Sequence, residues 1–245
     1  MAKSTSNLPI NYEEQLQKEA AEIAKRIAAP SGDRIRFNGN AGFITPDGNE
    51  GDALEVVIID FLSSNLFYDG PFDRDNPQPP ACFAIGDEPS HLVPSPNSPN
   101  RQADTCATCS MNQFGSAGNG KACKNTRLLA VVPAAAMDDP NADASVWIMS
   151  VPPASLRHYD AYVKSLAAKH KTVPTGVITR ITPDAGVAYA APRFNVVRPL
   201  EGKELGTFMT RRSEARERLV AEPDVSQYVP PKKGAAAGVA RRGVR

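Results

Sequence analysis

Leu54-Glu-Val-Val-Ile-Ile-Asp-Phe61 is the stretch that decides the fold class of this chain. Its uninterrupted run of β-branched residues is typical of a strand that is buried on both faces. The apolar pattern predicts that the strand continues toward Phe67 and Tyr68. We therefore expect a protein built around a β-sheet.

Further strand patterns lie on both sides of this run. Arg34-Ile-Arg-Phe37 alternates charged and apolar residues, and the glycines and the Pro46-Asp-Gly48 turn that follow predict a bulged strand or a hairpin. Downstream strands are predicted at 127–132, 146–151, 177–181 and 189–197. Three helices are predicted as well: one that begins with Asn11 as a capping residue and carries Leu16, Ile23 and Ile27 on one face, one at 155–170, and a charged one at 203–221.

The order of these elements is three or four strands, a helix and two strands. It matches the OB barrel, a five-stranded barrel whose helix lies between its third and fourth strands. We expect a mainly β chain with flanking helices (α+β), organised as an OB-like five-stranded barrel with a zinc-stapled insertion. The expected parts are a tail and helix at 1–30, the OB-like domain at 31–200 with its insertion at about 70–125, a C-terminal helix at 201–229 and a disordered basic tail at 230–245.

Composition limits what the chain can bind by bulk charge. The 245 residues carry a net charge of +1, so any binding of nucleic acid must come from local patches. The N-terminal residues contain no apolar run of the signal-peptide kind, and apolar stretches such as Val56–Ile59 are far too short to span a membrane. We expect a cytoplasmic protein with no membrane partner, and in that reducing compartment cysteines favour metal ligation over disulfides.

The cysteine spacing is Cys82-x23-Cys106-x2-Cys109-x13-Cys123, within a segment rich in Pro, Asn, Ser and Gly that we call the cysteine segment (residues 70–125). A C-x2-C pair turns both thiolates toward one ion about 2.3 Å away, and two more cysteines close a tetrahedral site. A closed site of this kind is structural and leaves no position for water chemistry. One structural zinc ion is the prediction, with an iron–sulfur cluster as the alternative and His91 as a possible replacement ligand.

Basic and aromatic residues suggest what the segment could bind. Gly115-Ser-Ala-Gly-Asn-Gly120-Lys121-Ala122 nearly spells a phosphate loop, but Ala122 lacks the hydroxyl that magnesium needs, so we expect the glycines to form turns. Cations suit a phosphate backbone, and exposed aromatic rings suit stacking with bases. The candidate DNA-binding residues are Arg34, Arg36, Tyr68, Phe72, Phe114, Lys121, Lys124, Arg127 and Arg193.

An enzyme is not expected. The chain has three histidines, none beside a nucleophile signature, and no G-x-S-x-G motif. Asp47 and Glu55 faintly suggest the carboxylates of a metal-dependent nuclease, but Val57 stands where the lysine of such a site belongs. We expect no catalytic residues.

Cys82-Phe-Ala-Ile-Gly86, Cys106-Ala-Thr-Cys109, Asn112-Gln-Phe-Gly-Ser116 and Gly120-Lys-Ala-Cys123-Lys-Asn125 together resemble a family of bacteriophage proteins, the zinc-containing single-stranded-DNA-binding proteins of OB type. The resemblance covers about residues 34–200 and is specific in the cysteine segment. It implies a protein that coats single-stranded DNA in phage DNA replication or recombination, in the host cytoplasm, alongside other replication or recombination proteins.

The resemblance also implies that the four cysteines bind zinc. The chain departs from the family at its end, where a basic tail from Lys232 to Arg245 replaces the usual acidic one. Two other functions remain open: a zinc-knuckle interaction protein, such as a phage regulator that docks on a host protein, and the metal-dependent nuclease.

Overall fold

The structure is a computed structural model. It describes residues 33–71, 73, 75–137 and 145–231, together with Tyr12, Gln15, Leu16 and Glu19, which are helical. The rest of the predicted N-terminal helix, including Asn11, Ile23 and Ile27, lies outside the described residues. The basic tail does as well, so its predicted disorder stays a prediction.

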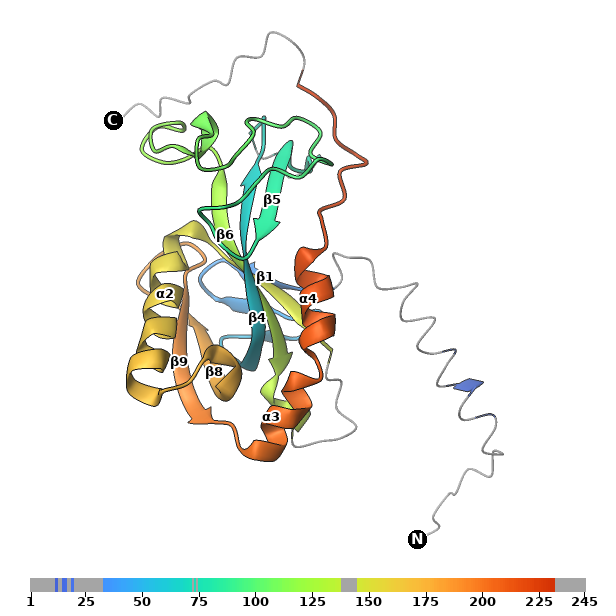
Figure 1. Cartoon of the computed structure of the whole chain (residues 1–245), viewed down its shortest axis with the longest axis vertical. Coiled ribbons are helices and arrows are strands. Elements are labelled where there is room, and N and C mark those ends of the chain that lie inside the picture. Colours follow the sequence, from blue (N-terminus) through green and yellow to red (C-terminus); the bar gives the residue numbers. More distant parts are fainter. Residues whose placement is uncertain are drawn as a thin grey trace.

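Nine strands of the described residues form one mixed sheet (Figure 1). The neighbour order is β3-β2-β1-β7-β6-β4-β8-β9, and β5 pairs with one end of β4. Every pairing is antiparallel except that of β1 with β7. The strands are β1 (Arg34–Asn38), β2 (Gly42–Ile44), β3 (Glu50–Gly51), β4 (Leu54–Phe67), β5 (Cys82–Gly86), β6 (Lys124–Pro133), β7 (Trp147–Val151), β8 (Val177–Pro183) and β9 (Pro192–Pro199).

Strand β4 links the two ends of the molecule. It is 14 residues long and pairs along most of its length with β6. A register shift between Ile58 and Asp60 marks a β-bulge, where the amide of Phe61 donates to the Asp60 carboxylate at 2.8 Å. A bulge bends a strand and increases its twist. The first residues of β4 therefore pair with β8 in the body, and its last residues pair with β5 beside the cysteine segment.

Helices cover both faces of the sheet (Figure 1). Helix α2 (Leu156–Ser165), extended by a π-turn at Leu166–His170, packs on one face. Helices α3 (Gly202–Met209) and α4 (Arg212–Val220) pack on the other. The single C-terminal helix expected from the sequence is thus two helices, divided at Thr210 and Arg211. Short 3-10 turns occupy Ser110–Asn112, Ala134–Met137, Pro153–Ser155 and Pro174–Gly176.

The alternation of side chains along the strands divides the interior into two cores. The α2 core lies inside the curl of the sheet, where both hairpins, β1–β2 and β8–β9, contribute side chains. The α4 core lies between the outer sheet face and the two C-terminal helices. The α2 core includes Ile35, Phe43, Ile58, Leu129, Tyr159, Tyr162 and Phe194, and the α4 core includes Val57, Leu62, Leu128, Ile148, Phe208 and Leu219.

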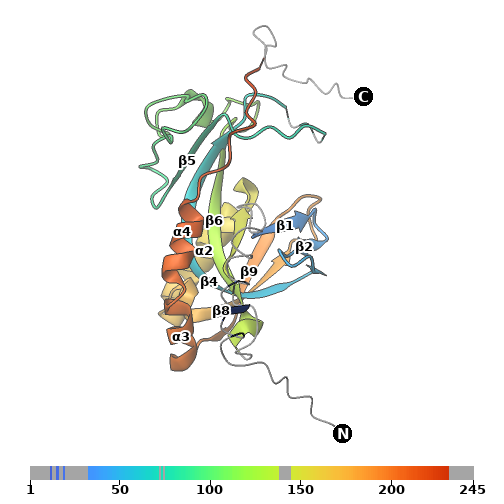
Figure 2. The same cartoon turned by 90° about the vertical axis from the view of Figure 1, so that its right-hand side faces the viewer.

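The prediction of a mainly β chain with flanking helices is confirmed. The sheet is curled, and Figure 2 shows the β1–β2 hairpin on the side away from α4. The strands β7-β6-β4-β8-β9 are consecutive neighbours, and α2 lies between β7 and β8 in the chain, as the sequence predicts. On its other side, β7 pairs with β1 rather than with β9. None of the helices in the described ranges is long and apolar enough to cross a membrane.

Docking of α4 depends on one buried side chain, which gives a first test of the fold. Leu219 is fully buried in the α4 core, whereas Val220 beside it is 47% exposed. We expect Leu219→Ala to lower the free energy of unfolding by about 2–5 kcal/mol, because it leaves a cavity. The control Val220→Ala should change it by less than about 0.5 kcal/mol. Urea unfolding followed by circular dichroism measures both, and equal effects would contradict this packing.

Candidate metal centre and nucleic-acid surface

The four cysteines come from three separate parts of the chain and line one small cavity. Cys82 begins β5 and lies opposite Phe67 in the β4–β5 ladder. Cys106 and Cys109 belong to the C-x2-C loop, and Cys123 immediately precedes β6. All four are buried and carry free thiols. The structure therefore places the four predicted ligands on the lining of one cavity.

The donor set of this cavity fits zinc. Burial first, and then the neighbouring thiols of Cys106, Cys109 and Cys82, raise the pKa of Cys123 to about 12. Four thiolates are the ligand set of closed structural zinc sites. As the side chains stand, no group of three or more Cys, His, Asp or Glu in the described ranges is arranged to hold a metal ion. His91 does not line the cavity; it is exposed and contacts Glu88 at 2.8 Å.

Backbone hydrogen bonds shape residues 105–123, which we call the knuckle. The amide of Cys106 donates to Leu92, that of Asn112 donates to Cys109, and that of Cys123 donates to Met111, at 2.8–3.0 Å. The glycine-rich stretch at 115–120 is a tight turn closed by a bridge between residues 117 and 120, with Gly115 and Gly118 at positive φ. The prediction that these glycines form turns is confirmed.

A network of asparagine side chains fastens the knuckle to the sheet. The Asn125 amide of β6 donates to Asn65 of β4 at 2.6 Å and to Asn112 of the knuckle at 2.9 Å. Asn112 donates to the Cys106 carbonyl at 2.8 Å, and the side chain of Asn65 hydrogen-bonds the Cys106 thiol. Lys121 donates to Asn125 at 3.0 Å. The network thus joins the cysteine cavity to two neighbouring strands. The sequence analysis did not identify Asn65, although it belongs to a polar run inside an otherwise apolar strand.

Two lysines lie over aromatic rings at the surface of the cysteine segment. Lys121 Nζ is 5.2 Å from the centroid of the Phe114 ring, and Lys124 Nζ is 5.0 Å from that of Tyr68. Both separations are within the range of cation–π attraction. Phe114 is 82% exposed, as expected from the sequence, whereas Tyr68 is half-buried. Phe72, the third aromatic candidate, lies outside the described residues.

The other candidate cations are dispersed. Arg34 is half-buried and lines a groove together with Tyr68, while Arg36, two residues on, is exposed. Arg127 donates to Ser63 at 3.0 Å on the α2 side of the sheet. Arg193 forms an ion pair with Asp184 and also contacts His158. The structure therefore groups Arg34 with the Tyr68–Lys124 pair and leaves Arg193 in the body of the protein.

Comparison with known protein families, with curated proteins and with solved structures gave no match to this chain. The resemblance to phage single-stranded-DNA-binding proteins therefore rests on its own residues.

The asparagine network predicts how the knuckle is held. Asn125→Ala removes the donor to both Asn65 and Asn112 and leaves polar groups unpaired, at a cost of about 1–3 kcal/mol. We expect faster hydrogen–deuterium exchange throughout the knuckle and unchanged exchange in α2 and α4. Asn119→Ala, at an exposed turn position, is the matched control. Equal exchange in the two variants would show that the network does not hold the knuckle.

Proposed function

We propose that this protein is a single-stranded-DNA-binding protein of OB type with one structural zinc ion, which coats single strands in phage DNA replication or recombination. The observation that carries the proposal is the pairing of Lys121 with Phe114 within the cysteine segment and of Lys124 with Tyr68 at its border. Sequence-tolerant binding of single strands combines cations along the backbone with rings on which bases stack. The two pairs supply both kinds of group side by side.

The position of the cysteine segment supports the same function. If β4 is the first OB strand, β6 and β7 are the second and third, α2 is the intervening helix, and β8 and β9 are the fourth and fifth. The cysteine segment is then the loop between the first two strands, which contributes to oligonucleotide binding in OB folds. The lysine–aromatic pairs lie in or beside that loop.

Zinc has a structural role in this proposal. Cys82, Cys106, Cys109 and Cys123 would hold it, and its charge would offset the repulsion among their thiolates. Bound there, it would tie the knuckle to β5 and to the start of β6. An iron–sulfur cluster is the alternative occupant of four thiolates.

The runner-up is a zinc-knuckle interaction protein. The 82% exposure of Phe114 favours it, because an exposed aromatic ring can also anchor a protein partner. The nuclease gains no support: Asp47 is bonded within its own turn to Thr45 and Asn49, and Glu55 forms an ion pair with Arg180. We propose that the protein is not an enzyme.

The metal is tested first. Protein purified without added metal should contain one zinc ion per chain, as measured by elemental mass spectrometry. The Cys109→Ser variant should lose this zinc. Ser110→Ala, next to that ligand and exposed, should keep the full content. Iron with the visible absorbance of a cluster would replace the zinc assignment, and no metal in freshly prepared, reduced protein would contradict both.

Binding of DNA is tested by fluorescence anisotropy of labelled oligo-dT at several salt concentrations. We expect Lys121→Ala/Lys124→Ala to weaken binding and to reduce the slope of log K against log[salt] by about 0.7 per lost phosphate contact. Phe114→Ala should cost about 1–3 kcal/mol if a base stacks there. The control Lys164→Ala/Lys169→Ala removes two exposed lysines of α2 and its π-turn and should bind as the wild type does. If the wild type fails to bind at low salt, the interaction protein becomes the better assignment.

A further inference from the structure

A groove of about 480 Å³ lies where the end of α4 meets the sheet, on the face opposite α2. Its apolar lining includes Leu66, Leu128 and Ile148, from three neighbouring strands. Tyr68 and Arg34 also line it, as do residues 221–224, which follow α4. Its volume is that of a typical small-molecule site.

No carboxylate of the described residues forms an ion pair with Arg34, although Asp33, Glu222 and Asp224 line the same groove. Burial lowers the pKa of Arg34. Arg218, on the same groove, is bonded instead to Asp33 and to Glu214. A half-buried guanidinium that no carboxylate of the described residues neutralises is suited to a phosphate group, which it can bind through two hydrogen bonds.

Ser64 supplies a second polar group in this groove. It lines the groove and is only 2% exposed. The hydroxyl of its neighbour Ser63 bonds Arg127, and that of Thr126 bonds the Ser64 carbonyl. A hydroxyl both donates and accepts, so Ser64 beside this apolar surface suits the polar edge of a bound base.

We infer that this groove holds one nucleotide of a bound single strand. Its base would lie on the apolar lining against Tyr68, with Ser64 at its polar edge, and its phosphate would lie on Arg34. The path can continue, because Tyr68 also lines a second groove of about 830 Å³ that includes Lys124. The inference rests on the proposed function and adds a position of the strand outside the knuckle.

Two carboxylates in the groove provide a second test of the inference, because their effect on binding should be opposite to that of Arg34. Glu222 and Asp224 both line it. Glu222 accepts hydrogen bonds from Ser95 at 2.5 Å and from Asn97 at 2.7 Å, which hold residues 221–224 beside β5 (Figure 1). Both carboxylates would repel a phosphate on Arg34. Their neutralisation should therefore strengthen binding at this site, whereas loss of Arg34 should weaken it.

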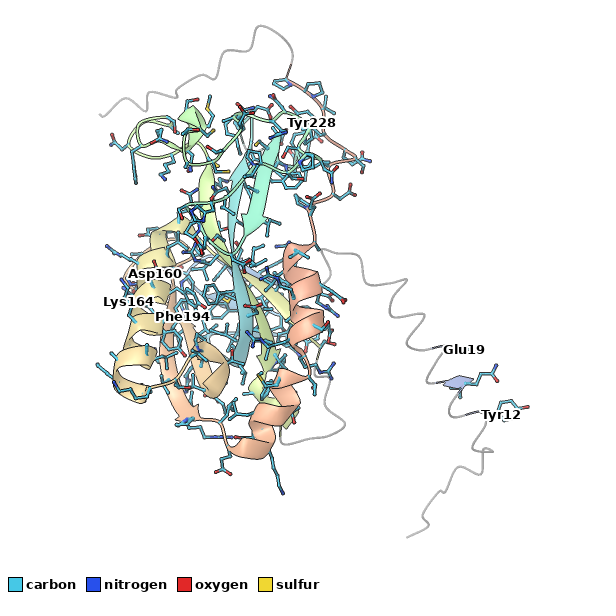
Figure 3. All side chains as sticks on the ribbon, viewed as in Figure 1. Tyr12, Glu19, Asp160, Lys164, Phe194 and Tyr228 are labelled. Carbon is cyan, nitrogen blue, oxygen red and sulfur yellow. The ribbon has the colours of Figure 1, made fainter. Side chains whose placement is uncertain are left out.

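Two variants and two charge-matched controls test these consequences in the full chain, with fluorescein-labelled oligo-dT as probe. Arg34→Gln should lower the affinity roughly tenfold, as expected for the loss of a charged hydrogen bond. Glu222→Gln/Asp224→Asn should raise it severalfold. Lys164→Gln and Asp52→Asn/Asp160→Asn make the same changes of charge away from the groove, and Figure 3 shows Asp160 and Lys164 on α2. Each control should bind within about twofold of the wild type.

Cross-linking gives an independent readout of position. Oligo-dT with one 5-iododeoxyuridine, irradiated on the wild-type protein, should yield a cross-linked peptide that contains Tyr68. Circular dichroism establishes that each variant is folded, and the gain expected of the acidic pair keeps the test decisive if Arg34→Gln unfolds. If the wild type binds and neither variant changes the affinity, the inference that the groove holds a nucleotide is wrong, whereas the proposed function is unaffected. Failure of the wild type to bind any oligonucleotide overturns both.

Discussion

The antiparallel pairing of β4 with β6 is the constraint on which the other parts of the structure depend. Both strands run from the part that holds the two cores to the part that holds β5 and the cysteine segment, so one ladder serves all three. Strand β4 stays paired with β6 on both sides of the bulge that follows Ile58. Its second partner is β8 before the bulge and β5 after it. Because the knuckle enters β6 directly through Cys123, any shift of register in this ladder would move the cysteine cavity as well.

The cysteine segment is held largely by polar contacts. Its only buried apolar cluster is small, made of Ala84, Leu92 and Cys106 in the described ranges. A segment that cannot bury enough apolar surface needs another source of order, such as a metal or satisfied polar networks. The asparagine network provides one, and the four thiols offer the site for the other. This explains why a long stretch poor in aliphatic residues can fold within a compact protein.

Several features could be predicted from the sequence because they are local. The β-branched run at 54–61, the helix at 155–170 and the glycine turns of the knuckle all follow from patterns within a few residues. The parallel pairing of β1 with β7 joins residues far apart in the chain and leaves no local signal. Strand β5 was not predicted from the sequence, because Cys82-Phe-Ala-Ile-Gly86 is a short apolar run inside a polar segment. For the candidate site, the cysteine spacing singled out four residues that line one cavity. Cation–aromatic neighbours in the sequence did not predict which cations are bonded within the protein, as Arg127 and Arg193 are.

The distribution of helices limits where a nucleic acid could bind. Helix α2 covers the inside of the curl, and α3 and α4 cover the outer face of β4, β6 and β7. Under the proposed OB assignment, part of the face that would receive a single strand is packed against the C-terminal helices. These helices do not cover the end beyond α4, where the groove, Tyr68 and the knuckle follow one another. With a net charge of +1 the chain has little bulk attraction for DNA at long range, so the proposed function relies on local cations such as Lys124 and Arg34.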